Sequence, residues 1–227
     1  MGEMVTFPSN GTTAEGYLAK PDTDKAPGVL VIQEWWGLND NIKSICERFA
    51  SEGFLALAPD LYHGRATTEP DEARKLAMSL QMETAAKDMS GAVDYLREHA
   101  GYTSVGAVGY CMGGGLALFI AALRGDVVKA VVPFYGLVPP SAPPVDWSKL
   151  QASVLGHYAE LDQGITVERV REFENQLKSL GKEVEIHIYQ GAQHGFCNDT
   201  RPQVYNREAC ELAWQRTIAF LREKLVS

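Results

Sequence analysis

The sequence predicts an α/β fold with a mostly parallel central sheet and helices on both faces. Short apolar runs alternate with stretches of helical periodicity along most of the chain, and this alternation is typical of parallel strands joined by crossover helices. Several runs are apolar throughout, as expected for strands buried on both faces. The chain has 227 residues, 45% of them hydrophobic, so we expect a single domain over residues 1–227.

The first expected element is an antiparallel hairpin at an edge of the sheet. Residues 4–7 and 15–20 have the composition of strands and flank a Ser-Asn-Gly turn at residues 9–11, which favours a hairpin. The continuous apolar run at residues 28–33 then predicts the first buried strand of the parallel sheet.

The next element is a helix over residues 40–51. Its sequence, DNIKSICERFAS, has helical periodicity, and Asp40 suits the N-cap position because its carboxylate can accept a hydrogen bond from a free backbone N–H group. Gly53 is expected to end the helix.

The rest of the chain repeats the alternation of strand and helix. After a strand at residues 54–58, a polar connection to about Pro70 leads into a long helical region that ends at His99. Later strands are expected at residues 105–110, 129–133, 153–158 and 184–189, and later helices at residues 112–123, 166–180 and 203–225. Functional side chains should lie on loops at the carboxyl ends of the parallel strands.

One connection differs from the others in composition. Residues 138–145, VPPSAPPV, hold four of the eleven prolines. Such a segment favours an ordered surface loop or a small lid, and it requires no domain boundary.

Charge and cysteine content limit the class of protein. The net charge of −8 opposes binding to nucleic acid or to an anionic membrane surface, since both need a basic patch. The N-terminal segment has neither a basic region nor an apolar core of a signal peptide, and no window is long and apolar enough for a membrane span. The four cysteines are irregularly spaced, which favours a reducing compartment. We therefore expect a cytoplasmic protein, a monomer or a small homo-oligomer.

The strand at residues 105–110 runs into Gly109-Tyr110-Cys111-Met112-Gly113. A strand, a Gly-x-nucleophile-x-Gly turn and a helix form a nucleophile elbow, with cysteine here in place of the usual serine. Gly109 and Gly113, two residues to either side of Cys111, avoid collisions of a Cβ atom with the neighbouring strand and helix. The thiol then lies at a helix N-terminus, where the helix dipole and free N–H groups favour negative charge.

An acid and a base follow later strands in the required order. Asp162 lies in the loop after the strand at residues 153–158, with Glu160 as a rival two residues away, and His194 lies in a Gly/Ala loop after the strand at residues 184–189. The order Cys111, Asp162, His194 is that of the α/β-hydrolases, so we expect an α/β-hydrolase fold with a Cys-His-Asp triad.

The chain resembles the dienelactone hydrolase family, the cysteine branch of the α/β-hydrolases. The resemblance spans nearly the whole chain and is carried by four ordered motifs. These are QEWWGLN at residues 33–39, PDLY at residues 59–62, VGYCMGG at residues 108–114 and HGF at residues 194–196.

The resemblance implies roles for residues around the thiol. Glu34 holds the place of a glutamate that contacts the nucleophile, so Cys111 would rest as a neutral thiol and pass its proton to Glu34 when substrate binds. A carboxylate beside a thiol does oppose its ionisation. The backbone N–H groups of Met112 and Trp35 map onto the oxyanion hole.

The chain departs from the family at the two arginines that hold a substrate carboxylate. Asn198 stands at one of these positions and Pro70 at the other, and Arg65, Arg74 or Arg201 could compensate. Tryptophans at residues 35 and 36 favour a neutral or aryl ester. The expected substrate-binding residues are Trp36, Tyr135, Phe196 and Asn198.

The predicted function is hydrolysis of a small ester or lactone through an acyl-thioester on Cys111, of the carboxymethylenebutenolidase type but with an altered substrate range. A broader carboxylesterase or thioesterase is an alternative. A protein of another class, a thiol redox sensor or a small-molecule binding protein without catalysis, would also use an elbow thiol. No grouping has metal-ligand spacing, and no cofactor is expected.

Overall fold

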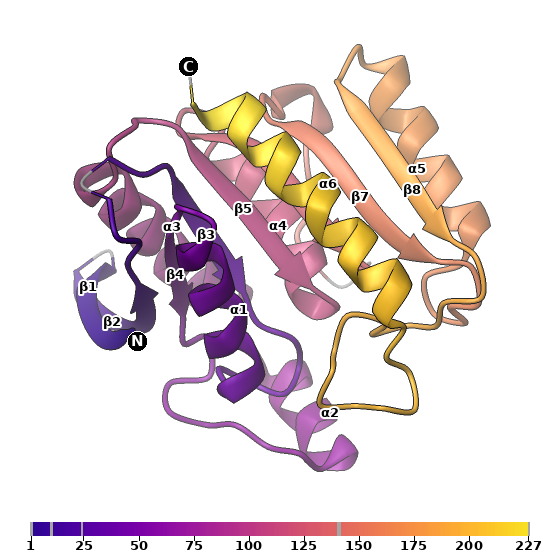
Figure 1. The fold of residues 1–227 in the computed structure, drawn as a ribbon, viewed down its shortest axis with the longest axis horizontal. Helices are drawn as coiled ribbons and strands as arrows, with labels where there is room; N and C mark the ends of the chain where they lie inside the picture. The colour runs from indigo at the N-terminus through magenta and orange to yellow at the C-terminus, as the bar shows by residue number, and fades with distance from the viewer. Residues whose placement is uncertain (1, 10, 24, 140–141, 227) are drawn as a thin grey trace.

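The computed structural model describes residues 2–9, 11–23, 25–139 and 142–226. Its strands form one sheet in the order β1-β2-β4-β3-β5-β6-β7-β8 (Figure 1). The pairs β1–β2 and β2–β4 are antiparallel, and every pair from β4 to β8 is parallel. The predicted α/β class and mostly parallel sheet are therefore confirmed. The strands are β1 (Glu3–Ser9), β2 (Thr12–Ala19), β3 (Gly28–Ile32), β4 (Leu55–Pro59), β5 (Val105–Tyr110), β6 (Val128–Phe134), β7 (Ser153–Ala159) and β8 (Val184–Tyr189).

Helices cover both faces of the sheet, as predicted (Figure 1). Helices α1 and α6 pack on one face, and α3, α4 and α5 pack on the other. The helices are α1 (Asp40–Ser51), α2 (Pro70–Ser79), α3 (Met82–His99), α4 (Met112–Leu123), the 3-10 helix η1 (Trp147–Lys149), α5 (Val167–Ser179) and α6 (Arg207–Leu225). Within the part of the chain described here, no helix combines the length and the apolar character that crossing a membrane requires.

The core consists of two layers, one on each side of the sheet. In β3, Leu30 and Ile32 belong to the cluster under α3 and α4, whereas Val29 and Val31 belong to the cluster under α1 and α6. Successive side chains of a strand point to opposite faces, so a strand between two helical layers must be apolar throughout. This is why the sequence of β3 is a continuous hydrophobic run.

One helix end differs from the sequence prediction. The N-cap of α1 is Asn39, which has extended backbone and whose side chain accepts a hydrogen bond from the Ile42 N–H at 3.2 Å. Asp40 is instead the first helical residue, where its charge still faces the positive end of the helix dipole. Gly53 follows the helix end with a φ of 89°, in agreement with the prediction.

The helical region between Pro70 and His99 is two helices rather than one. Leu80, with a ψ of 118°, ends α2, and Gln81 caps α3. This extended backbone lets Leu80 and Met82 pack against the core under α3. The predicted hairpin turn at residues 9–11 and the proline-rich connection at residues 138–145 include residues 10, 140 and 141, which lie outside the described residues.

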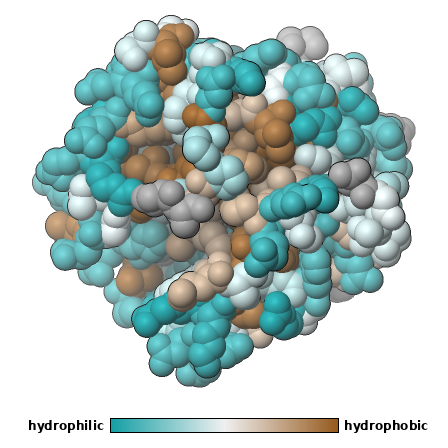
Figure 2. All heavy atoms as spheres, turned by 180° about the vertical axis from the view of Figure 1, so that it is seen from behind, coloured by the Kyte–Doolittle hydropathy of each residue, from teal (hydrophilic) through white to brown (hydrophobic). Residues whose placement is uncertain are grey.

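The face that carries α3, α4 and α5 is seen from behind the view of Figure 1. Its surface is mostly hydrophilic, and hydrophobic residues gather in hollows near the middle of the face (Figure 2). The predicted nucleophile, Cys111, lines two cavities of the protein.

Candidate active site

Cys111 lies between β5 and α4 in a sharp turn, with a φ of 56° and a ψ of −118°. This conformation is costly for a residue with a side chain and is typical of a nucleophile elbow. A Cβ atom on Gly113 would lie 2.5 Å from the Gln33 carbonyl oxygen and still closer to that of Ile32. Glycine is therefore required for the helix to begin so close to β3.

The structure brings Cys111, His194 and Asp162 together. His194 Nε2 lies 3.1 Å from Cys111 Sγ, and His194 Nδ1 lies 2.6 Å from Asp162 Oδ2. The second Asp162 oxygen accepts hydrogen bonds from the Gly164 and Ile165 N–H groups at 2.8 and 2.9 Å. The rival acid, Glu160, instead accepts a hydrogen bond from the Gly191 N–H group. The imidazole thus connects the thiol to a buried carboxylate that is held on both oxygens.

These contacts shift the protonation equilibria of both partners. Burial alone would raise the pKa of Asp162, but the hydrogen bonds and charge of His194 and the two backbone donors lower it below its ordinary value. Burial would lower the pKa of His194, yet its contacts with Asp162 and Cys111 raise it to about 10. The arrangement therefore stabilises an imidazolium beside the sulfur atom.

Glu34 follows β3 and is buried beside the triad. Asn198 Nδ2 donates to Glu34 Oε2 at 2.7 Å, and the Tyr135 hydroxyl donates to Glu34 Oε1 at 3.3 Å. Burial raises the pKa of Glu34, against the opposing effects of Asn198 and His194. The hydrogen bonds of Glu34 thus go to Asn198 and Tyr135, whereas the Cys111 sulfur faces His194. This differs from the direct contact between Glu34 and the thiol that the family resemblance implies.

The predicted substrate-binding residues occupy different environments. Trp36 lies beside Cys111 in a cavity wall, and Asn198 lines the same cavity but uses its amide to hold Glu34. Tyr135, at a φ of 39°, packs its ring against His194 at a centroid distance of 5.2 Å. Phe196 is fully buried behind Tyr135. We correct its expected role from substrate contact to packing, because an aromatic side chain two residues after His194 fills the core under the loop.

The two expected oxyanion donors directly follow Cys111 and Glu34 in the chain. Met112 is the first residue of α4, directly after Cys111, and Trp35 follows Glu34. Trp35 and Cys111 line the same two cavities. The Tyr62 hydroxyl donates to the Met112 sulfur at 3.6 Å and so packs the PDLY motif against the elbow. The motif is visible in the sequence, but this contact is not.

Two cavities meet at Trp35, Cys111 and His194. The first, of about 440 Å³, is here called the polar lobe and is walled by Trp36, Asp162, Gln163, Gln193, Asn198 and Arg201. The second, of about 620 Å³, is here called the apolar lobe and is walled by Ala77, Met78, Leu80, Met82, Leu137 and Ile165. Each volume falls in the range of about 300–1,000 Å³ that is typical of ligand pockets.

Of the three arginines considered in the sequence, Arg201 lies in the polar lobe. Its guanidinium stacks on Trp36 at 4.9 Å from the ring centroid, and among the described residues no carboxylate lies within ion-pair distance of it. Arg74 pairs with Asp71 on α2. Arg65 donates to the Tyr62 carbonyl oxygen. Arg201 is therefore the cation available to a ligand beside Cys111.

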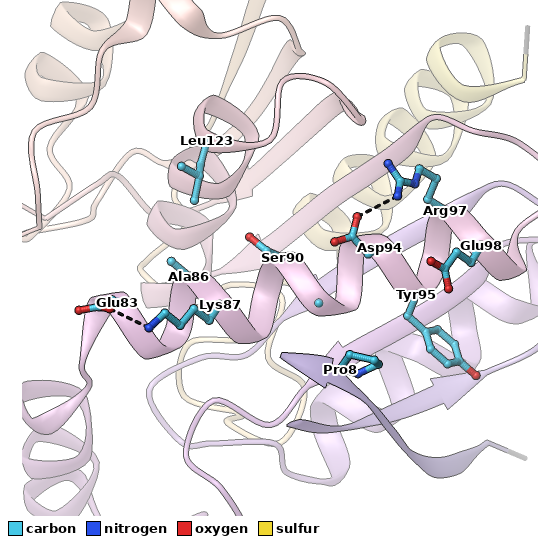
Figure 3. Close-up of a pocket in the computed structure, with 11 residues that line it drawn as sticks. Pro8, Glu83, Ala86, Lys87, Ser90, Asp94, Tyr95, Arg97, Glu98 and Leu123 are labelled. Atoms are coloured by element: carbon cyan, nitrogen blue, oxygen red, sulfur yellow. Dashed lines mark hydrogen bonds and ion pairs between the residues drawn. The ribbon is translucent and has the colours of Figure 1, made fainter. Parts of the chain in front are cut away.

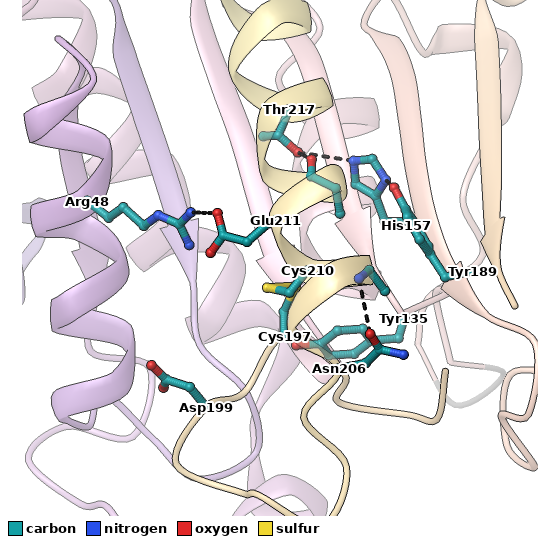
Figure 4. The surroundings of a disulfide bond; sticks show 12 residues. Arg48, Tyr135, His157, Tyr189, Cys197, Asp199, Asn206, Cys210, Glu211 and Thr217 are labelled. Atoms are coloured by element: carbon teal, nitrogen blue, oxygen red, sulfur yellow. Dashed lines mark hydrogen bonds and ion pairs between the residues drawn. A yellow bond between two sulfur atoms is a disulfide. The ribbon is translucent and has the colours of Figure 1, made fainter. Parts of the chain in front are cut away.

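Cys197 and Cys210 form a disulfide across 13 residues of sequence (Figure 4). The irregular spacing of the four cysteines does not predict this pairing. The bond fastens the loop that carries His194 and Asn198 to the first turn of α6. Cys46 is free and fully buried. Because two of the four cysteines are paired, the cysteine pattern does not support a reducing compartment, and the cytoplasmic location stays a prediction.

A further cavity of about 600 Å³ lies along α3, between Pro8 of β1 and Leu123 of α4 (Figure 3). Its lining includes the ion pair of Glu83 with Lys87 and that of Asp94 with Arg97, and it is remote from the thiol. Across the described ranges, no group of three or more His, Cys, Asp or Glu side chains is arranged to hold a metal ion.

Comparison with known proteins decides the family. The sequence profile of the dienelactone hydrolase family matches residues 14–225. The chain belongs to the dienelactone hydrolase family. "Protein usf" of Aquifex pyrophilus is 38% identical to it over 99% of this chain and 100% of the relative. A "Putative carboxymethylenebutenolidase" of Aquifex aeolicus is 35% identical over the same shares of the two chains.

Solved structures of the dienelactone hydrolase family agree in fold. The crystal structure of a "Putative Dienelactone Hydrolase" from Klebsiella pneumoniae superposes with a TM-score of 0.89, at 28% identity and 98% coverage of both chains. The eight-stranded sheet with helices on both faces is thus the α/β-hydrolase fold that the sequence predicts. This dienelactone hydrolase family member is accordingly a hydrolase of the carboxymethylenebutenolidase-like group.

Proposed function

We propose that this protein hydrolyses carboxylic esters or lactones through an acyl-thioester on Cys111. The observation that carries the proposal is the His194 imidazole, which lies within hydrogen-bond distance of both the Cys111 sulfur and the Asp162 carboxylate. A thiol at a helix N-terminus, a base beside it and an acid that orients the base are the parts that covalent catalysis needs.

In the first half-reaction, His194 takes the thiol proton and Cys111 Sγ attacks the carbonyl carbon. The backbone N–H groups of Met112 and Trp35 hold the negative charge that develops on the carbonyl oxygen. The tetrahedral intermediate then expels the alcohol, which takes its proton from His194 Nε2. In the second half-reaction His194 takes a proton from water, and the hydroxide attacks the thioester carbonyl. The carbon–sulfur bond then breaks, the Cys111 sulfur takes the proton back from His194, and the carboxylic acid is released.

Glu34 acts in this proposal as a positioning group rather than as the first proton acceptor. His194 is the base in contact with Cys111 Sγ, and both Glu34 oxygens accept hydrogen bonds from Asn198 and Tyr135. The buried carboxylate joins the end of β3 to the loop after His194 and to the residue after β6. Its negative charge also favours the imidazolium form of His194.

The proposed substrate is a small ester or lactone. It is not a lactone whose carboxylate is bound by two arginines, which is the substrate that the family resemblance implies. Asn198 and Pro70 occupy the two positions where the family resemblance places those arginines. A relative in Bradyrhizobium, 30% identical over 97% of this chain, is named "Probable 2-oxo-3-(5-oxofuran-2-ylidene)propanoate lactonase". That name supports lactones as a class to test.

Reaction with p-nitrophenyl acetate tests the proposal. We expect a burst of p-nitrophenol with an amplitude close to the enzyme concentration, followed by steady turnover, and we expect Cys111→Ala to abolish both. Equal rates in the two proteins would refute it. The alternative of a thiol sensor is not favoured, because Cys197 and Cys210 pair with each other and Cys46 is fully buried, so Cys111 has no cysteine partner among the described residues.

A further inference from the structure

The cavity at Cys111 has two arms of unlike chemistry. The apolar lobe is formed where α2 ends and α3 begins, with Met78, Leu80 and Met82 opposite Leu137. The polar lobe lies under the loop after β8, with Gln193 and Arg201. Each lobe is large enough for a substantial group, so a single small lactone ring at the thiol would leave most of both unfilled.

The position of each lobe along the reaction path assigns it to one side of the scissile bond. Met112 and Leu116, on the helix that follows Cys111, line the apolar lobe. Gln193 and Gly195, the neighbours of His194, line the polar lobe. The acyl group stays bonded to Cys111, whereas the leaving group takes its proton from His194. The apolar lobe therefore suits the acyl chain, and the polar lobe suits the leaving group.

Charge supports the same assignment. Arg201 is the cation in the polar lobe and has no carboxylate within ion-pair distance among the described residues. The charge of Arg201 acts on buried Glu34 and opposes the rise in its pKa, but the Glu34 oxygens accept their hydrogen bonds from Asn198 and Tyr135. Arg201 Nε and Nη2 each lie 3.2 Å from the Gln203 side-chain amide and donate to its oxygen. The guanidinium also stacks on Trp36 and lines the polar lobe, so its remaining N–H groups are suited to bind a carboxylate or phosphate.

We propose, building on the Cys111 chemistry above, that the preferred substrate is an ester or thioester that joins an apolar acyl chain to an anionic leaving group. Attack by Cys111 Sγ forms the sulfur–carbon bond and breaks the bond from the carbonyl carbon to the leaving oxygen or sulfur. That atom takes the proton from His194, and the anionic group of the leaving molecule pairs with Arg201. Water then hydrolyses the thioester and releases the carboxylic acid and the free thiol.

The acyl side is tested with p-nitrophenyl acetate, butanoate and hexanoate. Burial of each added methylene in the apolar lobe should raise kcat/KM by up to about fourfold, so hexanoate should exceed acetate by about tenfold or more. Met78→Glu, at an exposed position on the rim of the apolar lobe, should lower the ratio of hexanoate to acetate. Leu123→Glu, at an exposed position beside the cavity along α3, is the matched control and should keep the wild-type ratio.

The leaving-group side is tested with p-nitrophenyl butanoate with and without a carboxylate on the ring. For wild-type protein, the ratio of kcat/KM for the carboxylated ester to kcat/KM for the plain ester should exceed the ratio of their spontaneous hydrolysis rates. Arg201→Gln should lower the ratio of kcat/KM for the carboxylated ester to kcat/KM for the plain ester by about tenfold or more. Arg97→Gln, a matched surface arginine on α3, should retain it.

The results separate this inference from the proposed function. If Cys111 is needed for acetate hydrolysis but chain length and the ring carboxylate have no effect, the two-lobe assignment is wrong and the Cys111 mechanism stands. If Met78→Glu lowers the ratio of hexanoate to acetate no more than Leu123→Glu does, or if Arg201→Gln keeps the preference for the ring carboxylate, the assignment is also overturned. If acetate hydrolysis persists in Cys111→Ala, the proposed function itself fails.

Discussion

At the scale of single residues, the site combines a carboxylate that is easily ionised with one that is not. The pKa of Asp162 is lowered by His194 and two backbone N–H groups, whereas burial raises the pKa of Glu34. The two acids therefore have opposite effects on stability as pH changes. This difference allows their roles to be measured separately.

Replacement of Glu34 by glutamine should change the pH dependence of stability in a defined direction. The pKa of Glu34 in the folded protein is raised from its ordinary value of 4.5. At pH values between 4.5 and the raised pKa, the folded state therefore binds more protons than the unfolded chain. Stability from this group therefore falls as pH rises through the interval. Denaturant unfolding from about pH 4 to pH 8 should show Glu34→Gln gaining stability relative to wild type as pH rises.

Glu174 provides the control of opposite sign. It is buried and ion-paired with Arg171 and Lys178, which lower its pKa despite burial. Its contribution is present above the pKa of the unfolded chain and is lost as pH falls through the lowered value. Glu174→Gln should therefore lose stability relative to wild type as pH rises. A Glu34→Gln curve parallel to that of Glu174→Gln would contradict our account of Glu34.

Replacement of Asp162 by asparagine should affect both the rate and His194. Loss of the orienting carboxylate should lower kcat/KM by about 10³- to 10⁴-fold. It should also lower the pKa of His194 from its raised value of about 10, because Asp162 is the first of the contacts that raise it. An NMR titration of the imidazole measures this shift. Glu160→Gln, at the neighbouring acid, should change neither quantity, and an unshifted His194 in Asp162→Asn would oppose the triad.

At the scale of elements, the sequence predicts strands and helices better than the contacts between loops. The runs at residues 105–110 and 184–189 match β5 and β8, and residues 40–51 and 112–123 match α1 and α4, because hydrophobic periodicity is a local property. The break between α2 and α3 was missed, because Leu80 becomes extended to pack on the core rather than through any glycine or proline.

The disulfide was also missed, because pairing depends on where the loop after His194 meets α6. Its removal should destabilise the protein and loosen that loop. In a chain-entropy estimate, a disulfide that closes a loop of this size stabilises the folded protein by about 2–3 kcal/mol. We expect Cys197→Ser with Cys210→Ser to lower the unfolding free energy by this amount and to increase hydrogen exchange near Asn198.

Treatment with a thiol reductant separates the disulfide from other effects of the two substitutions. The reductant should destabilise wild-type protein to the level of the double variant and leave the double variant unchanged. Equal stability of reduced and oxidised wild-type protein would show that the bond does not hold this loop to α6.

At the scale of the whole molecule, the topology explains why residues far apart in sequence meet at one point. Parallel strands β3, β5, β6, β7 and β8 end at the same edge of the sheet, and Glu34, Cys111, Tyr135, Asp162 and His194 follow them. The order of motifs was enough to predict the triad contacts. It could not predict that Asn198 holds Glu34 or that the cavity has two lobes, because those features depend on side-chain packing between loops.

The central claim is that Cys111 carries the acyl group during turnover. Wild-type protein mixed with p-nitrophenyl acetate, quenched in acid within the burst and digested for mass spectrometry, measures this directly. We predict one acetyl group on the peptide that contains Cys111, at a level matching the burst, with rapid loss when substrate is exhausted. Turnover without an acetyl group on Cys111, or with one on another residue, would contradict the account.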